Sequence, residues 1–424
     1  MFRCVTQLKG LIIDIDGFGQ LNPSDWLPLT QKYACIFISS SDDVIKMLET
    51  KFPSKNIIQI ERFIKLFAPS KKTHGNALRQ LNLKTSEVAY VSANHQFISN
   101  AMKFLSGTIW INSSSPTYQE VSTCPDLICD NINDLVEALN KEVTGLFGEV
   151  VVNPLKFSAR SGFILALNYC EGEFEIPLYA AGRYFGYDHY MSQLHPYSSA
   201  IYLNKQTGKK YYGSFNEIFA KIYSSIINML KKDNSIQCVC HVPTRPGKED
   251  RFRTITAQIA KDNSIEDISR NFVCIKDYPS QKNLSAGDRY NNVKDAFRFQ
   301  GDLKEKTVVL IDDVMTTGST IRACIEQLQK HGANSVLVIV LAINQIDGSY
   351  WASAQPFVHC PNCDAKMHLL VNSNNQSFFY SCYERCLPNK AWKSLPFVAA
   401  REQLVDRVNS EFLHLTTSSS ETNL

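Results

Sequence analysis

The sequence lacks the features that mark several well-known classes of protein. No run of about 18 apolar residues occurs in its 424 residues, so no membrane-spanning helix is expected. The formal net charge of +3 is close to balance and gives no general affinity for nucleic acids or membranes. The Gly-rich loops of kinases and P-loop enzymes, the Gly-x-Ser-x-Gly turn and the His-Glu-x-x-His helix are also missing. These absences argue against a membrane protein, a kinase, a P-loop enzyme, a serine hydrolase of that type and a zincin.

The cysteine content argues against a protein held together by disulfides. Thirteen cysteines make an odd number, and nine of them are scattered among apolar or strand-like neighbours. This distribution is typical of reduced thiols. The first residues, Met1-Phe2-Arg3-Cys4, do not have the pattern of a signal peptide, so a cytoplasmic location is expected. The length and a hydrophobic fraction of 44% predict a globular protein of two or three domains.

The most informative stretch covers residues 308–320. Four apolar residues lead into the adjacent carboxylates of Asp312 and Asp313, and a run of hydroxyl residues around one glycine follows. An amphipathic helical pattern comes next, and residues 335–343 form a second continuous apolar run. The order predicts a strand–loop–helix–strand unit of a parallel sheet, with the acid pair at the end of the first strand.

The loop in this stretch has the chemistry of a phosphate site. A helix N-terminus presents N–H groups to an anion, and a glycine lets the backbone approach it closely. Ligands of open α/β sheets bind at the carboxyl edge, where the acid pair is expected. Adjacent carboxylates repel each other and add no stability at a buried edge, so a phosphate ester of a polyol is favoured over a chance pair of acids in a turn. The loop residues are Thr316, Thr317, Gly318, Ser319 and Thr320.

All thirteen positions of 308–320 resemble the 5-phosphoribosyl-1-pyrophosphate (PRPP) loop of type I phosphoribosyltransferases. The resemblance implies that Asp312 and Asp313 are catalytic and accept the ribose 2- and 3-hydroxyls together with Mg²⁺. It also implies that the loop binds the 5-phosphate. The pyrophosphate would be approached by the loop after an earlier strand, which here carries Arg245 and Lys248.

The segment 281–297 resembles the ComF-like branch of these transferases. In that branch a basic, flexible segment covers the pyrophosphate, so Arg289 is expected to bind it, the alternative being a surface arginine without a contact. In this fold the acceptor is selected by a group of loops called the hood, expected here within 160–205. The sequence of these loops does not identify the acceptor. Aromatic residues of the hood predict either stacking of a base or, more often for such hairpins, core packing.

The N-terminal part of the chain contains a second constellation. Apolar strands that alternate with helical segments predict a small doubly wound α/β domain. The predicted strands of this domain are 8–16, 34–38, 88–91 and 108–111.

The polar residues of this domain resemble, in order and spacing, those of the haloacid dehalogenase (HAD) superfamily. The resemblance implies a nucleophile at Asp14, an acid/base at Asp16, a phosphate-binding hydroxyl at Ser39 or the next serine, and a cation at Lys71 or the next lysine. The late acidic pair of that family is replaced by Ser-Ala-Asn-His-Gln-Phe over 92–97, which leaves Mg²⁺ poorly held. A degenerate domain with a binding or packing role is therefore favoured over a phosphatase, and a plain strand end is the remaining alternative.

Four cysteines near the C-terminus form two pairs with a short strand-rich segment between them. This spacing resembles a zinc ribbon, in which four thiolates close a tetrahedral Zn²⁺ site with a structural role. His359 and His368 lie near enough in the sequence to compete as ligands. The four cysteines are Cys360, Cys363, Cys382 and Cys386.

The sequence thus predicts an α/β protein with a HAD-like domain (1–142), a phosphoribosyltransferase domain (143–347), a zinc-binding segment (348–395) and a C-terminal helix with a disordered tail (396–424). Three functions stay open. The first is transfer of phosphoribose from PRPP to an unidentified acceptor, with Mg²⁺ and release of pyrophosphate. The second is a PRPP-binding or nucleotide-binding regulator or DNA-handling protein, whose zinc segment contacts a protein or nucleic acid. The third is a bifunctional transferase with a HAD phosphatase activity.

Overall fold

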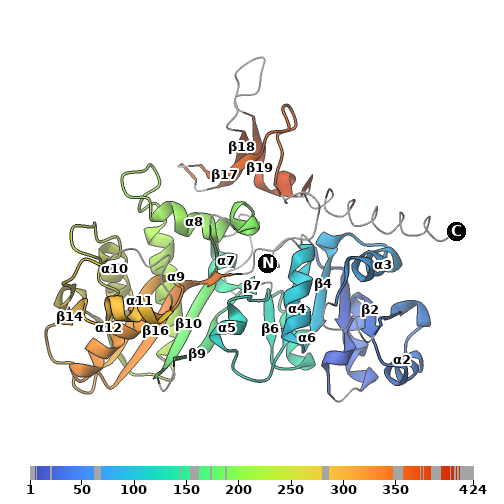
Figure 1. Ribbon diagram of the computed structural model, residues 1–424, viewed down its shortest axis with the longest axis horizontal. Helices are drawn as coiled ribbons and strands as arrows, with labels where there is room; N and C mark the ends of the chain where they lie inside the picture. Colours follow the sequence, from blue (N-terminus) through green and yellow to red (C-terminus); the bar gives the residue numbers. More distant parts are fainter. Residues whose placement is uncertain are drawn as a thin grey trace.

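Among the described residues, the computed structural model contains three sheets of three or more strands, which follow one another along the chain (Figure 1). The first sheet lies at the blue end of the colour scale, the second runs from green to orange, and the third, in red, lies beside both. The structure describes residues 5, 7–19, 22–61, 68–143, 145–152, 162–171, 174–186, 189–278, 286–346, 357–372, 374–375, 377–382, 393–401, 403–404, 407 and 410.

Six parallel strands form the first sheet, in the order β3-β2-β1-β4-β5-β6. Helices α3 and α4 pack on one face and α1, α2 and α6 on the other, so the strands are almost entirely apolar. The predicted doubly wound α/β arrangement is confirmed. The strands are β1 (Gly10–Asp14), β2 (Ala34–Ser39), β3 (Ile57–Gln59), β4 (Val88–Ser92), β5 (Gly107–Ile111) and β6 (Leu127–Cys129). The helices are α1 (Leu27–Lys32), α2 (Asp42–Glu49), α3 (Lys71–Leu81), α4 (His95–Ala101), α5 (Tyr118–Val121) and α6 (Ile132–Asn140).

The second sheet has the order β12-β11-β15-β16-β10-β9, and β9 alone of its described strands runs antiparallel to its neighbour. Helices α9 and α10 cover one face and α12 covers the other. Its strands are β9 (Leu165–Glu171), β10 (Phe174–Phe185), β11 (Ile236–His241), β12 (Glu266–Asp267), β15 (Thr307–Met315) and β16 (Ser335–Gln345). The helices of this part are α7 (Phe147–Val152), α8 (Pro196–Asn204), α9 (Asn216–Leu230), α10 (Arg253–Asn263), α11 (Ala286–Val293) and α12 (Ser319–Lys330). Two small pairs of strands complete it, β7 (Gly145–Leu146) with β8 (Gly162–Phe163) and β13 (Phe272–Cys274) with β14 (Phe297–Phe299).

The strand–loop–helix–strand unit predicted from 308–343 is present as β15, α12 and β16. One detail of the prediction is wrong, because β15 does not end at the acid pair. The strand continues to Met315, and its pairing with β16 joins Asp312 to Val340 and Val314 to Ala342. The pairing of neighbouring strands therefore overrides the local polarity of two adjacent carboxylates.

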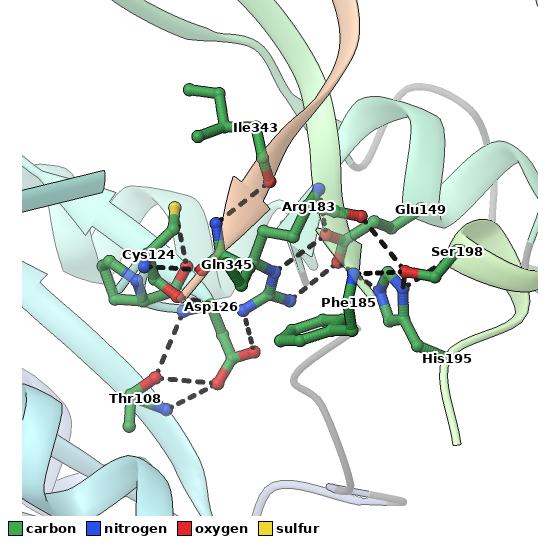
Figure 2. A network of polar contacts seen from close by, with 11 residues as sticks. Thr108, Cys124, Asp126, Glu149, Arg183, Phe185, His195, Ser198, Ile343 and Gln345 are labelled. Atoms are coloured by element: carbon green, nitrogen blue, oxygen red, sulfur yellow. Dashed lines mark hydrogen bonds and ion pairs between the residues drawn. The ribbon is translucent and has the colours of Figure 1, made fainter. Parts of the chain in front are cut away.

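A buried polar network joins the first two sheets (Figure 2). The guanidinium of Arg183, on β10, is 1% exposed and contacts the carboxylates of Asp126 at 2.9 Å and Glu149 at 2.7 Å. Asp126 also accepts hydrogen bonds from the N–H and the hydroxyl of Thr108 on β5, both at 2.9 Å. Gln345, the last residue of β16, bonds the main chain just beyond α5. The first sheet is therefore joined to the second by charged side chains that are buried and paired with each other.

The third sheet is antiparallel, in the order β17 (Met367–Val371), β18 (Phe378–Cys382) and β19 (Ser394–Pro396). It packs on the second part of the chain through the rings of Phe378 and Phe215, whose centroids lie 6.5 Å apart. The hydroxyl of Tyr211 also donates to the carbonyl of Val371 at 2.6 Å. No helix in the described part of the chain is long and apolar enough to cross a membrane.

Candidate functional site

A cavity of about 650 Å³ opens where β11 and β15 reach the edge of the second sheet. The segment that follows β11 supplies Arg245, Lys248 and Arg251, and β15 supplies Asp312. Tyr278 closes one side, where its carbonyl accepts a hydrogen bond from Arg245 Nη1 at 2.8 Å. Three basic side chains thus share one cavity with the carboxylates of Asp312 and Glu249, an excess of positive charge that suits a diphosphate.

The two adjacent acids of β15 differ sharply in their surroundings. Asp313 is buried, and its carboxylate pairs with Lys205 Nζ at 3.0 Å and with the guanidinium of Arg251. Burial alone would raise the pKa of Asp313, but Lys205 and Arg251 outweigh it and lower the pKa below its ordinary range. Burial and the neighbouring charge of Asp313 raise the pKa of Asp312 to about 7. One acid is therefore held ionised, while the other changes its protonation near neutral pH.

The loop between β15 and α12 is fixed by two tyrosine hydroxyls. Tyr169, on β9, donates to the carbonyl of Thr317 at 2.7 Å. Tyr118, on α5, donates to the carbonyl of Thr316 and lies 3.3 Å from that of Met315. Gly318 has a φ of +72°, and a Cβ at this position would lie 2.6 Å from the ring of Tyr169. Only glycine fits here, for the backbone conformation and for the contact.

The remaining loop residues lie at the start of α12. Ser319 is the first residue of α12, and its hydroxyl lies 3.5 Å from that of Thr317. Thr320 follows in the first turn of the same helix, so the N–H groups of the helix start and these hydroxyls share one end of the helix.

Sequence reasoning missed four residues of this site, namely Lys205, Arg251, Tyr118 and Tyr169. Arg251 could have been suspected from the density of basic residues that follow β11. The other three carry no local signal, because each lies more than 100 residues before the residue that it contacts. Arg289 lies on α11, and its side chain is outside the described residues.

Three of the residues predicted from the HAD resemblance, Asp14, Asp16 and Ser39, lie at one edge of the first sheet. Asp14 ends β1 and is buried, and the Ser92 hydroxyl at the end of β4 donates to its Oδ2 at 2.7 Å. Asp16 accepts three hydrogen bonds, from the Ser39 hydroxyl at 2.6 Å, the Ser40 N–H at 2.9 Å and the Ser40 hydroxyl at 2.5 Å. The expected serine therefore binds the second aspartate in this structure.

Lys71 begins α3, a helix whose first turn is capped by the side chain of Ser70. The sequence at 92–97 becomes the end of β4, a turn capped by Asn94 and the start of α4. The turn is built by hydrogen bonds among neutral side chains and main chain, with the Asn94 N–H donating to Ser92 Oγ at 2.8 Å. The structure thus places neutral polar groups where the HAD resemblance required carboxylates for Mg²⁺.

Three of the predicted zinc ligands come together. The sulfur atoms of Cys360, Cys363 and Cys382 lie within 4.8 Å of one another, and those of Cys363 and Cys382 are 3.5 Å apart. Cys386 falls outside the described residues. Three thiolates at this spacing form a cluster that can bind a soft metal ion such as Zn²⁺.

The two histidines considered as competing ligands lie apart from this cluster, which within the described residues consists of cysteines alone. His359 Nδ1 is 2.8 Å from the carbonyl oxygen of Asp364. His368 lines a separate cavity of about 180 Å³ between β17 and α8. Three aromatic residues of the predicted hood, Tyr184, Phe185 and Tyr202, line the same cavity, and Phe185 is also part of the core.

Residues 254–361, about a quarter of the chain, match the family model described as a phosphoribosyl transferase domain. The matched stretch contains the acid pair, the phosphate loop and α12. This stretch is therefore similar to a phosphoribosyl transferase domain, and it contributes β12, β15 and β16 to the second sheet.

Curated relatives match shorter stretches. Competence protein F of Haemophilus influenzae is 32% identical over 91 residues, which cover 21% of this chain and 40% of that protein. The DNA utilization protein YhgH of Escherichia coli is 41% identical over 59 residues, 14% of this chain and 26% of that protein. The transcriptional regulator GfcR of Methanosphaera stadtmanae is 50% identical over 40 residues, 9% of this chain and 20% of that protein. The chain thus spans less than half the length of each of these relatives.

Solved structures give weaker similarity. A hypoxanthine phosphoribosyltransferase from Staphylococcus aureus is 16% identical, with 32% of this chain and 71% of that chain covered and a TM-score of 0.23. Phosphoribosylpyrophosphate synthetase from Mycobacterium smegmatis is 13% identical, with 79% and 81% covered and a TM-score of 0.24. TM-scores this low add nothing to the family match.

Proposed function

We propose that the chain binds PRPP with Mg²⁺ and transfers its phosphoribosyl group to an acceptor with release of pyrophosphate. The observation that carries this proposal is the meeting of three parts at one sheet edge. These parts are a loop with a glycine in the left-handed conformation, an acid pair beside it, and a cavity with three basic side chains that Asp312 of the acid pair also lines.

Each part has its own task in the reaction. The main-chain N–H groups and hydroxyls of 316–320 bind the 5-phosphate. Asp312 and Asp313 accept hydrogen bonds from the ribose hydroxyls. Their negative charge also favours the positive character that the ribose gains as the bond to pyrophosphate breaks. Arg245 and Lys248 neutralise the departing pyrophosphate, and Arg251 lines the same cavity in its ion pair with Asp313. Positioning and charge stabilisation then supply the rate, and no covalent intermediate is needed.

The donor set fits Mg²⁺ at Asp312. This carboxylate lines the cavity, and oxygen is the ligand that Mg²⁺ prefers. Asp313 fits the metal less well, because Lys205 and Arg251 already neutralise it. When bound, the ion would screen the charge of the diphosphate, and it is held best when Asp312 is ionised.

Isothermal titration with PRPP in the presence of Mg²⁺ tests binding. The wild-type chain is expected to bind PRPP, and the double variant Asp312→Asn with Asp313→Asn is expected to lose that binding. Asp233→Asn, on the exposed surface after α9, is the control and keeps it. The proposal is wrong if the wild type does not bind PRPP or if the double variant binds it equally well. Pyrophosphate release in the presence of a panel of nucleobases and small acceptors then tests catalysis.

A second candidate is a PRPP-binding regulator or DNA-handling protein without transferase activity. It is favoured by the names of the relatives, a competence protein and a DNA utilization protein. In this case the third sheet, with Cys386 as the fourth zinc ligand in a zinc-ribbon-like module, would contact a protein or nucleic acid. Binding of PRPP without pyrophosphate release across the acceptor panel, together with binding of labelled single-stranded DNA, would establish this function in place of the first.

For the first sheet we propose a degenerate HAD-like domain with a packing role. The support is that Asp16 is held by Ser39 and Ser40, and that Asp14 faces Ser92 instead of a metal-binding acid. Hydrolysis of p-nitrophenyl phosphate or sugar phosphates at several Mg²⁺ concentrations, if abolished by Asp14→Asn, would instead establish the bifunctional enzyme.

A further inference from the structure

We infer that Tyr118, which belongs to the first part of the chain, is a positioning residue for the phosphate loop of the second sheet. The inference rests on the proposed function, since the loop is taken to bind the 5-phosphate of PRPP. It goes beyond that function because it makes the first part of the chain a component of the PRPP site.

The geometry of the loop gives the reason. Its two central carbonyls, those of Thr316 and Thr317, each accept a hydrogen bond from a tyrosine hydroxyl. One hydroxyl, of Tyr169, comes from the second sheet itself, and the other, of Tyr118, comes from α5 at the end of the first sheet. The two rings meet edge to face, with centroids 5.3 Å apart. These two hydrogen bonds, which we call the clamp, therefore come from both parts of the chain.

A clamp on carbonyl oxygens affects anion binding in two ways. It fixes the orientation of the peptide groups whose N–H ends belong to the loop, so the loop does not have to be ordered when a phosphate arrives. A hydrogen bond accepted by a carbonyl also polarises its peptide group, which strengthens the donor at the other end. Burial and the neighbouring Tyr169 raise the pKa of Tyr118 far above its ordinary value, so its hydroxyl remains a donor at every physiological pH.

Tyr118 is itself held firmly in place. Thr117 and Glu120 form a capping box at the start of α5, with the Thr117 N–H donating to Glu120 at 2.8 Å. At the end of α5, the side chain of Gln345 donates to the carbonyl of Val121 at 3.0 Å and accepts from the N–H of Cys124 at 2.8 Å. The segment that carries Tyr118 is thus anchored on the end of β16, the strand next to the one that carries the acid pair.

The experiment separates the phosphate loop from the pyrophosphate cavity by the choice of ligand. Ribose 5-phosphate uses the loop, inorganic pyrophosphate uses the basic cavity, and PRPP uses both. Tyr118→Phe removes one hydroxyl and keeps the ring. In isothermal titrations this variant is expected to bind ribose 5-phosphate and PRPP about threefold to tenfold more weakly, the loss of one hydrogen bond. Its affinity for pyrophosphate should stay within about twofold of the wild type, and its melting temperature within about 2 °C.

Two further variants make the result specific. Tyr169→Phe removes the other half of the clamp and should weaken ribose 5-phosphate binding in the same way. Tyr33→Phe changes a tyrosine between α1 and β2 of the first sheet and should change none of the three affinities.

The outcomes distinguish the two proposals. If the wild type binds PRPP and Tyr118→Phe binds ribose 5-phosphate unchanged, the inference is wrong and the proposed function stands. If Tyr118→Phe weakens pyrophosphate as much as ribose 5-phosphate and lowers the melting temperature, the role of Tyr118 is only structural, and the inference is again wrong. If the wild type binds none of the three ligands, the proposed function fails, and the inference fails with it.

Discussion

Replacement of Glu149 by glutamine is a sharp test of the buried polar network around Arg183. Glu149 accepts three hydrogen bonds from Arg183, from its main-chain N–H at 2.9 Å, Nε at 2.8 Å and Nη2 at 2.7 Å. His195 Nε2 lies 3.5 Å from the same carboxylate. Burial alone would raise the pKa of Glu149, but Arg183 and His195 reverse this and hold the pKa well below its ordinary range. The side chain is therefore ionised in the folded protein.

The cost of Glu149→Gln follows from these contacts. One carboxylate oxygen becomes an NH₂ group that faces N–H donors of Arg183, so a hydrogen bond to a charged group is lost, at about 1.5–3 kcal/mol. A buried donor is also left without an acceptor, at about 1–3 kcal/mol. Since Arg183 keeps Asp126, we expect a total loss of about 3–5 kcal/mol, in the range measured for a broken buried ion pair. For a unit of this size the melting temperature should fall by about 10 °C.

Differential scanning calorimetry of the full chain provides the measurement. Glu217→Gln is the matched control, because Glu217 forms an exposed pair with Lys221 on α9 and its replacement should leave the melting temperature unchanged. A fall of less than about 2 °C for Glu149→Gln would refute the reasoning, because it would mean that Arg183 does not depend on this carboxylate.

Three further predictions concern the sites. Gly318→Ala should weaken PRPP binding more than about tenfold in isothermal titration, because the Cβ would clash with Tyr169 at a φ of +72°; equal affinity would contradict this. Mg²⁺-dependent PRPP binding should strengthen from about pH 6 to about pH 8, as Asp312 ionises near pH 7, and Asp312→Asn should remove this dependence. Conversely, because the folded pKa of Asp312 is raised from 3.8, its contribution to stability without ligand falls as pH rises between about 4 and 7. Cys360→Ser should lower the zinc content measured by atomic absorption, and an unchanged content would exclude this thiolate as a ligand.

The sequence predicts well those features that depend on neighbouring residues. The apolar runs and the 3.6-residue periodicity of 308–343 suffice to place β15, α12 and β16, because each element buries a face that its own residues define. The composition of the predicted phosphate loop follows from the sequence for the same reason, since its glycine and hydroxyl residues lie within five positions. The residue at which β15 ends cannot be predicted from the local sequence, because the pairing of β15 with β16 determines it.

Contacts between distant segments explain the other misses. Lys205 reaches Asp313 from the end of α8, and Tyr118 reaches the loop from the first sheet. In each case the residue type is ordinary for its local position, a lysine after a helix and a tyrosine in a short helix. Their roles arise only when the two sheets and α8 are assembled, and periodicity and spacing along one segment do not encode that assembly.

The buried network around Arg183 has a consequence for any attempt to dissect the chain. The junction near residue 143 divides two sheets, but the partners of Arg183 lie on both sides of it, Asp126 before and Glu149 after. A fragment that begins at 143 would carry the whole family match and yet lose Asp126, Tyr118 and the cover over the end of β16. Two fragments split at this point should therefore behave as an obligate heterodimer, each poorly soluble alone and recovered together on co-expression.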